Sequence, residues 1–533
     1  MRGARRRGLS ASGQARPRNH STPKVVALTA AVVAAFIAVL GVVRHGADPA
    51  TGGAAPTPAH QAKATPSASV GCQGRRAVHV TLTTPHLTHA LQSMPGVQFC
   101  NGSLESASTI TVSDGLRYQR VQGFGAAMTD SSAWLLMTQL SASQRKRVFD
   151  SLFGPAGIRL NYLRVPMGAS DFSATGMPYT YDDEPDGDSD PTLANFSVAH
   201  DLAYIIPALR KARSLNPSLR LLANPWSPPA WMKANGRLDN ADHAGQVLPS
   251  AYPALAQYFV KFLQSYADDG VDIDAITPQN EPNVPAHYPG AELDPDGESD
   301  FISDYLAPAL RNAGLTTMIY GNDLSWDRVP YATGLASSQA AEDLTGISWH
   351  CYRGEPDVMG SFHNQFPGLE EIVAECSPEI LGFETIELLI SSLRDYASTV
   401  LVWNVALDPD GGPVQAPDSG CHGCRGIVTV SEADGSVQNN VKYYELGQVS
   451  KFVQPGAVRI GSTSNVTYYD QMHPSRFRST PGVDNVAFVN PDDSKVLVAN
   501  NTSDYNQRFV VTWHGAAFRY TLPAGATVTF TWR

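Results

Sequence analysis

The chain has 533 residues, with 39 lysines and arginines against 50 aspartates and glutamates, a formal net charge of −11 at pH 7. Residues 1–44 hold eight of the basic residues and none of the acidic ones, so the remainder has 31 basic against 50 acidic residues, a net charge of −19. This acidic body excludes nucleic acid and anionic membranes as partners of the folded part, and the length allows a large domain plus a smaller one.

The N-terminus has the pattern of an export signal. A basic start is followed by an uncharged apolar run of 19 residues, 25–43, so residues 1–45 are predicted to be a signal peptide or an N-terminal anchor that interacts with a membrane. Residues 46–71 are rich in Pro, Ala and Thr and are predicted to form a disordered linker. We therefore expect a secreted or cell-surface protein.

Short alternating runs at both ends of the chain predict β-strands. Residues 72–119 include the runs 79–83 and 109–112, and Asp114 with Gly115 is a hairpin turn signal. A few N-terminal strands could not bury a face alone, so we expect them to join residues 454–533 in one antiparallel β-sandwich. The C-terminal strands are expected at 485–490, 495–500, 509–513 and 527–532.

Between these ends, residues 120–453 alternate strand patterns with helix patterns. Amphipathic stretches at 200–214, 252–268 and 300–313 suit covering helices, and Ser141 with Gln144 forms a capping-box signature. Eight strands with crossover helices predict an α/β fold, the (β/α)8 or TIM barrel. The strands are expected near residue 122 and at 159–166, 219–225, 274–279, 316–322, 346–352, 371–375 and 399–407.

Two of these predicted strands end close to a carboxylate. Glu281 follows the run 274–279 and precedes Pro282, and Glu375 closes the run 371–375, 94 residues later. Barrel enzymes keep their chemistry at the carboxyl ends of the strands, and a pair of carboxylates there is typical of glycoside hydrolysis. The competing interpretation is that one of the two is only a surface charge at a strand end.

Six cysteines in an exported chain permit disulfides. Cys421 and Cys424 have metal-like spacing, but no second pair completes four ligands, so a local disulfide is favoured over zinc. Cys72 and Cys100 could pair, and Cys351 and Cys376 could be buried thiols or partners. No cofactor or metal is expected, because the sequence has no zinc-protease, phosphate-loop or dinucleotide-binding motif.

Five stretches along the predicted barrel point to one family. They are 123–130 (GFGAAMTD), 163–173 (LRVPMGASDFS), 225–233 (PWSPPAWMK), 280–282 (NEP) and 403–409 (WNVALDP). Over residues 118–450 the chain resembles glycoside hydrolase family 30, the family of glucosylceramidase. The resemblance implies a barrel with a β-sandwich built from both chain ends, and a retaining mechanism.

The resemblance also assigns the two carboxylates. Glu281 corresponds to the acid/base and Glu375 to the nucleophile, with the carboxyl groups about 5–5.5 Å apart and the pKa of Glu281 above that of Glu375. Asn280 would hold the sugar 2-hydroxyl, although a turn-stabilising role is the plain alternative. Asp171, Trp226 and Trp403 match positions that hold sugar hydroxyls, and Trp403 also supplies an apolar face; alone, either Trp could be core.

Three further positions would support this site. Arg164 lies inside a strand, where it is expected to pair with a carboxylate such as Glu375 and keep it ionised. His350 and Tyr352 match a family strand that lines the site near the nucleophile, although a single strand His is often a core residue. Cys351 and Ser377 depart from the mammalian pattern, which puts the shape of the pocket in doubt.

These patterns predict a retaining β-glycosidase that hydrolyses β-glucosidic bonds by double displacement and resembles glucosylceramidase. The alternatives are an endo-β-1,6-glucanase of the same family and a non-catalytic carbohydrate-binding surface protein. The expected partner is a β-glucoside, either glycolipid or glucan. The oligomeric state does not follow from the sequence.

Overall fold

The computed structural model describes residues 76–533 except 103, 105, 107, 416–419 and 472–475, and these residues belong to one compact unit. The expected export segment 1–45, the linker 46–71 and a pairing of Cys72 with Cys100 lie wholly or partly outside the described residues. Among the helices of the described part, none is long and apolar enough to span a bilayer.

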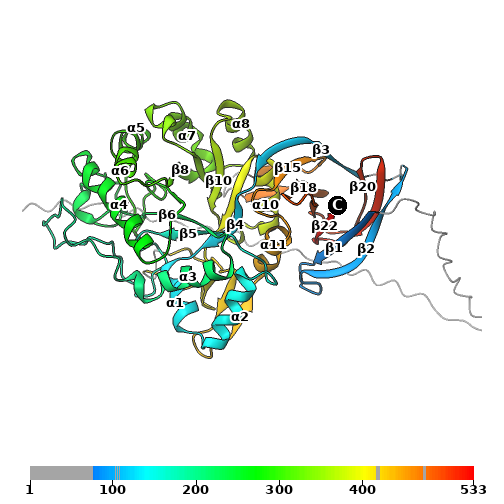
Figure 1. Ribbon diagram of the computed structural model, residues 1–533, viewed down its shortest axis with the longest axis horizontal. Coiled ribbons are helices and arrows are strands. Elements are labelled where there is room, and N and C mark those ends of the chain that lie inside the picture. The colour runs from blue at the N-terminus through cyan, green and yellow to red at the C-terminus, as the bar shows by residue number, and fades with distance from the viewer. Residues whose placement is uncertain (1–75, 103, 105, 107, 416–419, 472–475) are drawn as a thin grey trace, which may run out of the picture. The chain divides into compact units, whose positions relative to one another are not determined.

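The described residues contain a closed barrel of eight parallel strands, which confirms all eight predicted strands in chain order. Helices lie around it, as Figure 1 shows. The bounds are β4 (Gly123–Ala127), β5 (Tyr162–Pro166), β6 (Arg220–Asn224), β7 (Ala275–Ile276), β8 (Met318–Ser325), β9 (Gly346–His350), β10 (Glu370–Glu375) and β11 (Ala397–Val402).

The predicted helices are present with two departures, the first being that the stretch 200–214 begins with a 3-10 helix, η1 (Asp201–Ala203), before its α-helix starts at Ile205. Ser141 and Gln144 form the expected capping box, and the predicted helix 252–268 has those bounds in the structure. A π-helical segment, η4 (Phe301–Leu306), interrupts the single helix predicted at 300–313. The helices are α1 (Asp130–Thr138), α2 (Ala142–Phe153), α3 (Ile205–Leu215), α4 (Tyr252–Asp268), α5 (Pro295–Asp300), α6 (Ala307–Asn312), α7 (Val329–Ala336), α8 (Asp357–Gln365), α9 (Pro378–Leu381), α10 (Thr385–Arg394) and α11 (Val441–Ser450).

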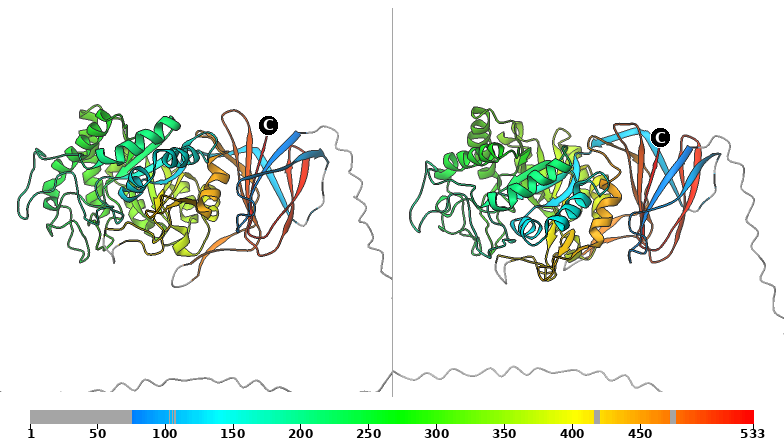
Figure 2. Two further views of the ribbon diagram at one scale, coloured as in Figure 1. Left: turned by 90° about the horizontal axis from the view of Figure 1, so that it is seen from below. Right: turned by 60° about the horizontal axis from the view of Figure 1, so that its bottom comes forward.

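Strands from both chain ends form the β-sandwich, as expected, and Figures 1 and 2 show the blue N-terminal strands beside the red C-terminal ones. Its two sheets are continuous, because the long strands β2 and β3 pair in both. One pair, β3 with β20, is parallel. The strands are β1 (Arg76–Thr83), β2 (Gln92–Asn101), β3 (Thr109–Arg120), β15 (Val458–Ser462), β18 (Val483–Val489), β19 (Lys495–Asn501), β20 (Gln507–Trp513), β21 (Ala516–Leu522) and β22 (Thr527–Trp532).

Smaller sheets and the connecting helices complete the fold. β12 (Ala406–Leu407), β13 (Val428–Val430) and β14 (Val437–Asn439) form one small sheet, and β16 (Tyr468–Gln471) pairs with β17 (Arg476–Ser479). Helix α11 joins barrel and sandwich through Gln448, whose side chain is hydrogen-bonded to Thr83 of β1 at 2.8 Å and to Thr529 of β22 at 2.6 Å.

Apolar side chains fill the barrel, so polar chemistry is confined to its mouth. Tyr162, Leu222, Tyr320, Ile372 and Leu401 belong to the buried cluster inside the barrel. Above this cluster, at the carboxyl ends of the strands, the backbone becomes irregular. Several residues other than glycine have a positive φ angle there, in the left-handed region. The non-glycine residues of this kind at the mouth are Glu281 (φ 41°), Asn283 (65°), Asn322 (77°), Asp323 (47°) and Asn404 (64°).

Such angles are costly for residues with a Cβ and tend to mark functional sites. Strand β7 has two residues where six were predicted. After Ile276 the chain turns away from the regular ladder, although Asn280 N–H still donates to Pro225 O at 2.8 Å and Glu281 N–H to Asp323 O at 3.2 Å. The turn brings Glu281 to the mouth of the barrel.

Candidate active site

Glu375 reaches the barrel mouth through an irregularity at the end of β10. Its neighbour Ala374 belongs to the cluster inside the barrel, whereas Val373 packs outside it. If side chains alternated strictly along β10, the Glu375 carboxylate would point outward, as the Val373 side chain does. The register with β9 shifts between Val373 and Glu375, and the carboxylate instead faces Arg164. Irregularities of this kind commonly redirect a side chain beside an active site.

The two candidate catalytic carboxylates lie close together. Oxygen atoms of Glu281 and Glu375 and a ring nitrogen of His350 all lie within 4.8 Å of one another. This spacing would also suit metal ligands, but the Arg164 guanidinium already contacts Glu375. Within the described residues, one other group has such spacing, formed by Asp182, Glu184 and Asp190.

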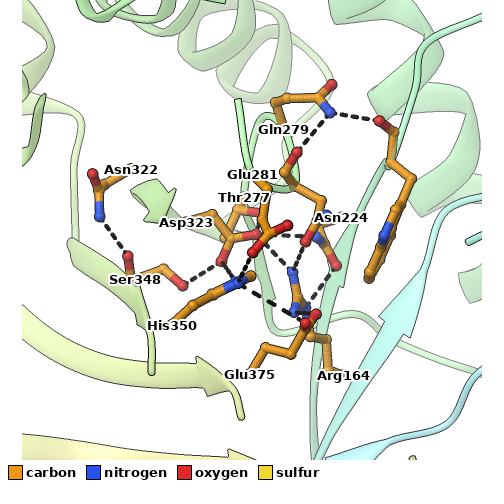
Figure 3. Close-up of polar contacts among 12 residues, drawn as sticks. Arg164, Asn224, Thr277, Gln279, Glu281, Asn322, Asp323, Ser348, His350 and Glu375 are labelled. Atoms are coloured by element: carbon orange, nitrogen blue, oxygen red, sulfur yellow. Dashed lines mark hydrogen bonds and ion pairs between the residues drawn. The ribbon is translucent and has the colours of Figure 1, made fainter. Parts of the chain in front are cut away.

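Arg164 is the centre of a buried polar network beneath the carboxylates (Figure 3). Its side chain is fully buried and pairs with Glu375, which confirms the predicted partner. It also donates to Asp323 at 2.7 Å, Asn280 at 2.8 Å and Asn224 at 3.0 Å. A buried guanidinium needs this complete set of acceptors, because an unpaired charge there would be strongly destabilising.

Asp323 accepts several further hydrogen bonds of this network. It accepts hydrogen bonds from Ser348 at 2.5 Å, Thr277 at 3.1 Å and Asn224 at 3.1 Å, in addition to the Arg164 contact. Burial acts to raise its pKa, but Arg164 and His350 outweigh this and hold the pKa of Asp323 below its usual range. Asp323 is therefore a buried anion that balances the charge of Arg164.

His350 connects Asp323 to Glu281. Its Nε2 lies 3.3 Å from Asp323 and its Nδ1 lies 3.1 Å from Glu281 and 4.0 Å from Glu375. Burial disfavours the charged ring, yet the charges of Glu375 and Asp323 raise the pKa of His350 to about 9. At neutral pH the ring is consequently an imidazolium that donates to both Asp323 and Glu281.

Glu375 is held by donors at both carboxylate oxygens. Arg164 donates to Oε2, and the Tyr352 hydroxyl donates to Oε1 at 2.7 Å. Burial raises the pKa of Glu375, while Arg164, His350 and the Tyr352 hydrogen bond lower it and offset burial only in part. Arg164 thus lowers the pKa of Glu375, which is the direction expected from the sequence. That the pKa of Glu281 lies above that of Glu375 stays a prediction.

A pocket of about 360 Å³ opens above the network. Five of the residues predicted from sequence line it: Asp171, Glu281, Tyr352, Glu375 and Trp403. The other four, Arg164, Trp226, Asn280 and His350, are buried and do not line it. The predicted site residues therefore form two layers, a lining that substrate could touch and a support that positions the lining.

The aromatic residues show this layering directly. Trp226 stacks on Trp403 with ring centroids 5.2 Å apart, and its other neighbour is Arg164, 4.8 Å from the ring centroid. Trp403 lines the pocket together with the rings of Tyr288 and Tyr352, and Trp226 backs Trp403. Asn280 also belongs to the support, because its Oδ1 accepts a hydrogen bond from Arg164, and its contact with the sugar 2-hydroxyl stays a prediction.

Asp171 is the third predicted sugar-binding residue of the lining. Its carboxylate is hydrogen-bonded to the backbone N–H of Cys421, and its Oδ1 is buried without a protein partner. Burial, followed by the charges of Glu375 and Glu281, raises the pKa of Asp171 well above its usual value. A buried acceptor that lacks a partner and faces a polar pocket suits a ligand hydroxyl.

Two further residues of the site, Asp323 and Tyr288, were not predicted from the sequence. Asp323 directly follows the predicted strand 316–322, so a charged residue at a strand exit was the available signal. Tyr288 lines the pocket from a loop, and burial with the charge of Glu281 raises its pKa well above the usual value. No sequence pattern marks Tyr288.

Two disulfides frame the site among the described residues. Cys421 and Cys424 are bonded, which confirms the predicted local disulfide. Cys351 and Cys376 are bonded to each other, which decides between the two interpretations left open by the sequence.

Comparison with known proteins agrees with this geometry. Residues 121–453 match the model of the glycosyl hydrolase family 30 TIM-barrel domain, and residues 456–530 match that of the family 30 beta sandwich domain. The chain belongs to glycosyl hydrolase family 30. Two predictions, of the fold class and of the family, are thereby confirmed.

Relatives within the family differ in their substrates. The chain is 34% identical to endo-1,6-beta-D-glucanase neg1 of Aspergillus fumigatus over 75% of this chain and 83% of that one. It is 29% identical to lysosomal acid glucosylceramidase of Mus musculus, over 80% and 83%. A solved structure, the endo-beta1,6-glucanase BT3312, is 28% identical with a TM-score of 0.73, over 85% of this chain and 99% of that one.

Proposed function

We propose that this family 30 glycosidase is a retaining endo-β-1,6-glucanase. The observation that carries the mechanism is the approach of Glu281 and Glu375, whose oxygen atoms lie within 4.8 Å. Retaining glycosidases have carboxyl groups about 5–5.5 Å apart, whereas inverting ones leave about 6.5–9.5 Å for a water molecule. The short separation supports double displacement.

In the first step, Glu375 attacks the anomeric carbon while Glu281 gives its proton to the leaving glycosidic oxygen. The C–O bond to the leaving sugar breaks as the bond to Glu375 forms, which produces a covalent glycosyl-enzyme. In the second step, Glu281 takes a proton from water, the water oxygen attacks the same carbon, and Glu375 is released. Two inversions give net retention.

The surrounding residues prepare both carboxylates for these roles. Arg164 and Tyr352 donate to the two oxygens of Glu375 and favour the anion that attacks. His350 donates to Glu281 from a ring nitrogen 3.1 Å away, so it orients that carboxyl group toward the leaving oxygen. Asp171 and Trp403 then remain to hold the sugar from the pocket wall.

The choice of glucan over glycolipid rests on the relatives and on the pocket mouth. Three curated relatives at 33–34% identity are named endo-1,6-beta-D-glucanases, whereas those named glucosylceramidases are 26–30% identical. Asp327, Arg328 and Arg353 contribute charged side chains to the pocket lining. Such a rim favours a hydrated sugar chain over two lipid tails.

Glucosylceramide is the second candidate, because part of the pocket lining is apolar. Val284, Pro285, Leu324 and Ile380 line it, and Ile380 is 40% exposed. An exposed aliphatic side chain at a pocket could contact lipid.

The test offers the full-length protein a β-1,6-glucan, a β-1,3-glucan and glucosylceramide in mixed micelles. We expect rapid shortening of the β-1,6-glucan with oligosaccharides as early products, and β-anomers by proton NMR before mutarotation. Glucose as the sole early product, or faster release of ceramide, would overturn the endo-glucanase assignment. No turnover of any β-glucoside would leave a carbohydrate-binding protein, and α-anomers would exclude retention.

We further propose that the protein acts outside the cytoplasm. The basic and apolar N-terminal pattern supports export, and the two disulfides of the described region suit an oxidising compartment. Fractionation of the producing cells, with protease applied to intact cells, tests this. Protection of the protein until the cells are lysed would contradict it.

A further inference from the structure

The nucleophile candidate and its hydroxyl donor come from neighbouring strands that are joined covalently just beyond their ends. Glu375 is the last residue of β10, and Cys376 follows it. Cys351 follows the last residue of β9, His350, and precedes Tyr352. Cys351 and Cys376 form a disulfide with their Cα atoms 5.3 Å apart, and both are buried.

Backbone pairing between β9 and β10 does not extend to Tyr352, so it does not fix the position of that side chain. The paired register of β9 with β10 ends at His350 opposite Glu375, and it already shifts between Val373 and Glu375. Beyond it, residues 351–356 form a loop with no helix or strand before α8. Tyr352 lies in this loop, one residue after the disulfide, and its hydroxyl is 2.7 Å from Oε1 of Glu375.

The disulfide also reaches the third strand of the site. The carbonyl of Cys376 accepts the backbone N–H of Trp403 at 2.7 Å, and Trp403 is the aromatic wall of the pocket. The next residue, Ser377, has its hydroxyl 3.0 Å from the Cys424 sulfur. The half-cystine at 376 therefore lies between the nucleophile, the aromatic wall and the second disulfide.

We infer that the Cys351–Cys376 disulfide is a positioning element for catalysis, which acts by holding the Tyr352 hydroxyl on Oε1 of Glu375. The inference rests on the proposed function. The cystine does not touch the reacting atoms; it replaces the missing ladder beyond β9 and β10 by a covalent link. Because that hydrogen bond stabilises the anion of Glu375, losing it raises the pKa of the nucleophile.

The test is a double-mutant cycle between the disulfide and the hydroxyl. The variants are Cys351→Ala/Cys376→Ala, Tyr352→Phe and the combination of all three, each assayed on an activated aryl β-glucoside. We expect the cysteine variant to lose roughly 10- to 100-fold in kcat with KM nearly unchanged, since small misplacements in an active site cost that much. The acid limb of the pH–rate profile of the cysteine variant should move to higher pH. Adding Tyr352→Phe should cause little further loss, because both changes remove the same contact.

Two outcomes would overturn the inference. If the cysteine variant keeps its kcat and only melts at a lower temperature, the disulfide serves stability alone. If the losses from the cysteine and tyrosine changes multiply, the disulfide does not act through Tyr352. Should the alanine pair not fold, Cys351→Val/Cys376→Ala retains more of the buried volume and replaces it in the same cycle.

A structural readout separates this inference from the proposed function. Crystal structures of the wild type and of the cysteine variant give the distance from the Tyr352 hydroxyl to Oε1 of Glu375. We expect it to exceed hydrogen-bond range, about 3.5 Å, in the variant. An unchanged distance refutes positioning even if the enzyme proves active on another sugar. A wild type that cleaves no β-glucoside refutes the proposed function while this distance still decides the role of the disulfide.

Discussion

Arg164 and Asp323 form a fully buried ion pair, with Nη2 of the arginine 2.7 Å from Oδ2 of the aspartate. Their side chains are 0% and 1% exposed. The pair lies within the network that carries both candidate catalytic carboxylates: Arg164 contacts Glu375, and Asp323 reaches Glu281 through His350. A charge pair that supports a site in this way should contribute to stability as well as to activity.

The substitution Asp323→Asn is predicted to destabilise the protein. It leaves Arg164 with an uncompensated share of its buried charge, and breaking a buried pair typically costs about 3–5 kcal/mol of unfolding free energy. Urea unfolding of the variant measures the change. Asp327→Asn, at a 36% exposed side chain nearby, is the control and should change stability by less than about 0.5 kcal/mol. A loss below 1 kcal/mol at Asp323 would mean that the pair is not required.

Substitution of the two carboxylates should separate their roles. Glu375→Gln should abolish turnover on every substrate while the protein remains folded, because no covalent intermediate can form. Glu281→Gln should lower kcat on glucan by roughly 10²–10⁴-fold, the usual contribution of a general acid. On a dinitrophenyl glucoside, whose leaving group needs no proton, its glycosylation step should be largely retained. Equal losses of that step on both substrates would contradict the assignment of Glu281.

The acid limb of the pH profile should report the nucleophile. Glu375 must be ionised to attack, and its pKa is raised by burial, so kcat/KM should fall with decreasing pH at higher values than an ordinary glutamate would give. Removing the cation of His350 by His350→Gln raises that pKa further and should move the limb upward. His243→Gln, at an exposed histidine, is the matched control. If the acid limb of His350→Gln instead moved to lower pH, the ionisation of Glu375 would be excluded as the cause of that limb.

Glu371 should make the folded protein less stable as pH rises. Its carboxyl is buried against Trp349, and burial raises its pKa to about 9, whereas in the unfolded chain it is about 4.5. The folded state therefore holds this proton more tightly, and stability is lost as pH rises from about 4.5 toward 9. Glu371→Gln has no proton to lose.

We expect Glu371→Gln to melt above the wild type at pH 8 and close to it at pH 4.5, by scanning calorimetry at both values. Glu432→Gln, at an exposed glutamate, controls for the loss of one surface charge. A gain that is the same at both pH values would show that titration of Glu371 is not responsible.

Local patterns in the chain were sufficient for the architecture. Apolar runs of strand length, amphipathic stretches between them and the capping residues around Ser141 are short-range signals, and all eight barrel strands were found where they predict. Glu281 and Glu375 could likewise be identified from their positions after such runs and from the family resemblance. These features depend on neighbours in sequence, which is why they can be read there.

Tertiary structure alone decided how the site is layered. Trp226, Asn280 and His350 were predicted to bind substrate, yet packing placed them beneath the lining, in the same layer as the supporting residue Arg164. The register shift at Glu375 and the left-handed backbone at Asp323 aim two carboxylates inward, against strict alternation along each strand.

The role of Asp323 and the partner of Cys351 were decided in the same way. Both depend on contacts between segments 25 to 159 residues apart in the chain. The order of residues determined which strands and carboxylates exist, whereas burial and the balance of charge among distant segments determined which of them face the substrate.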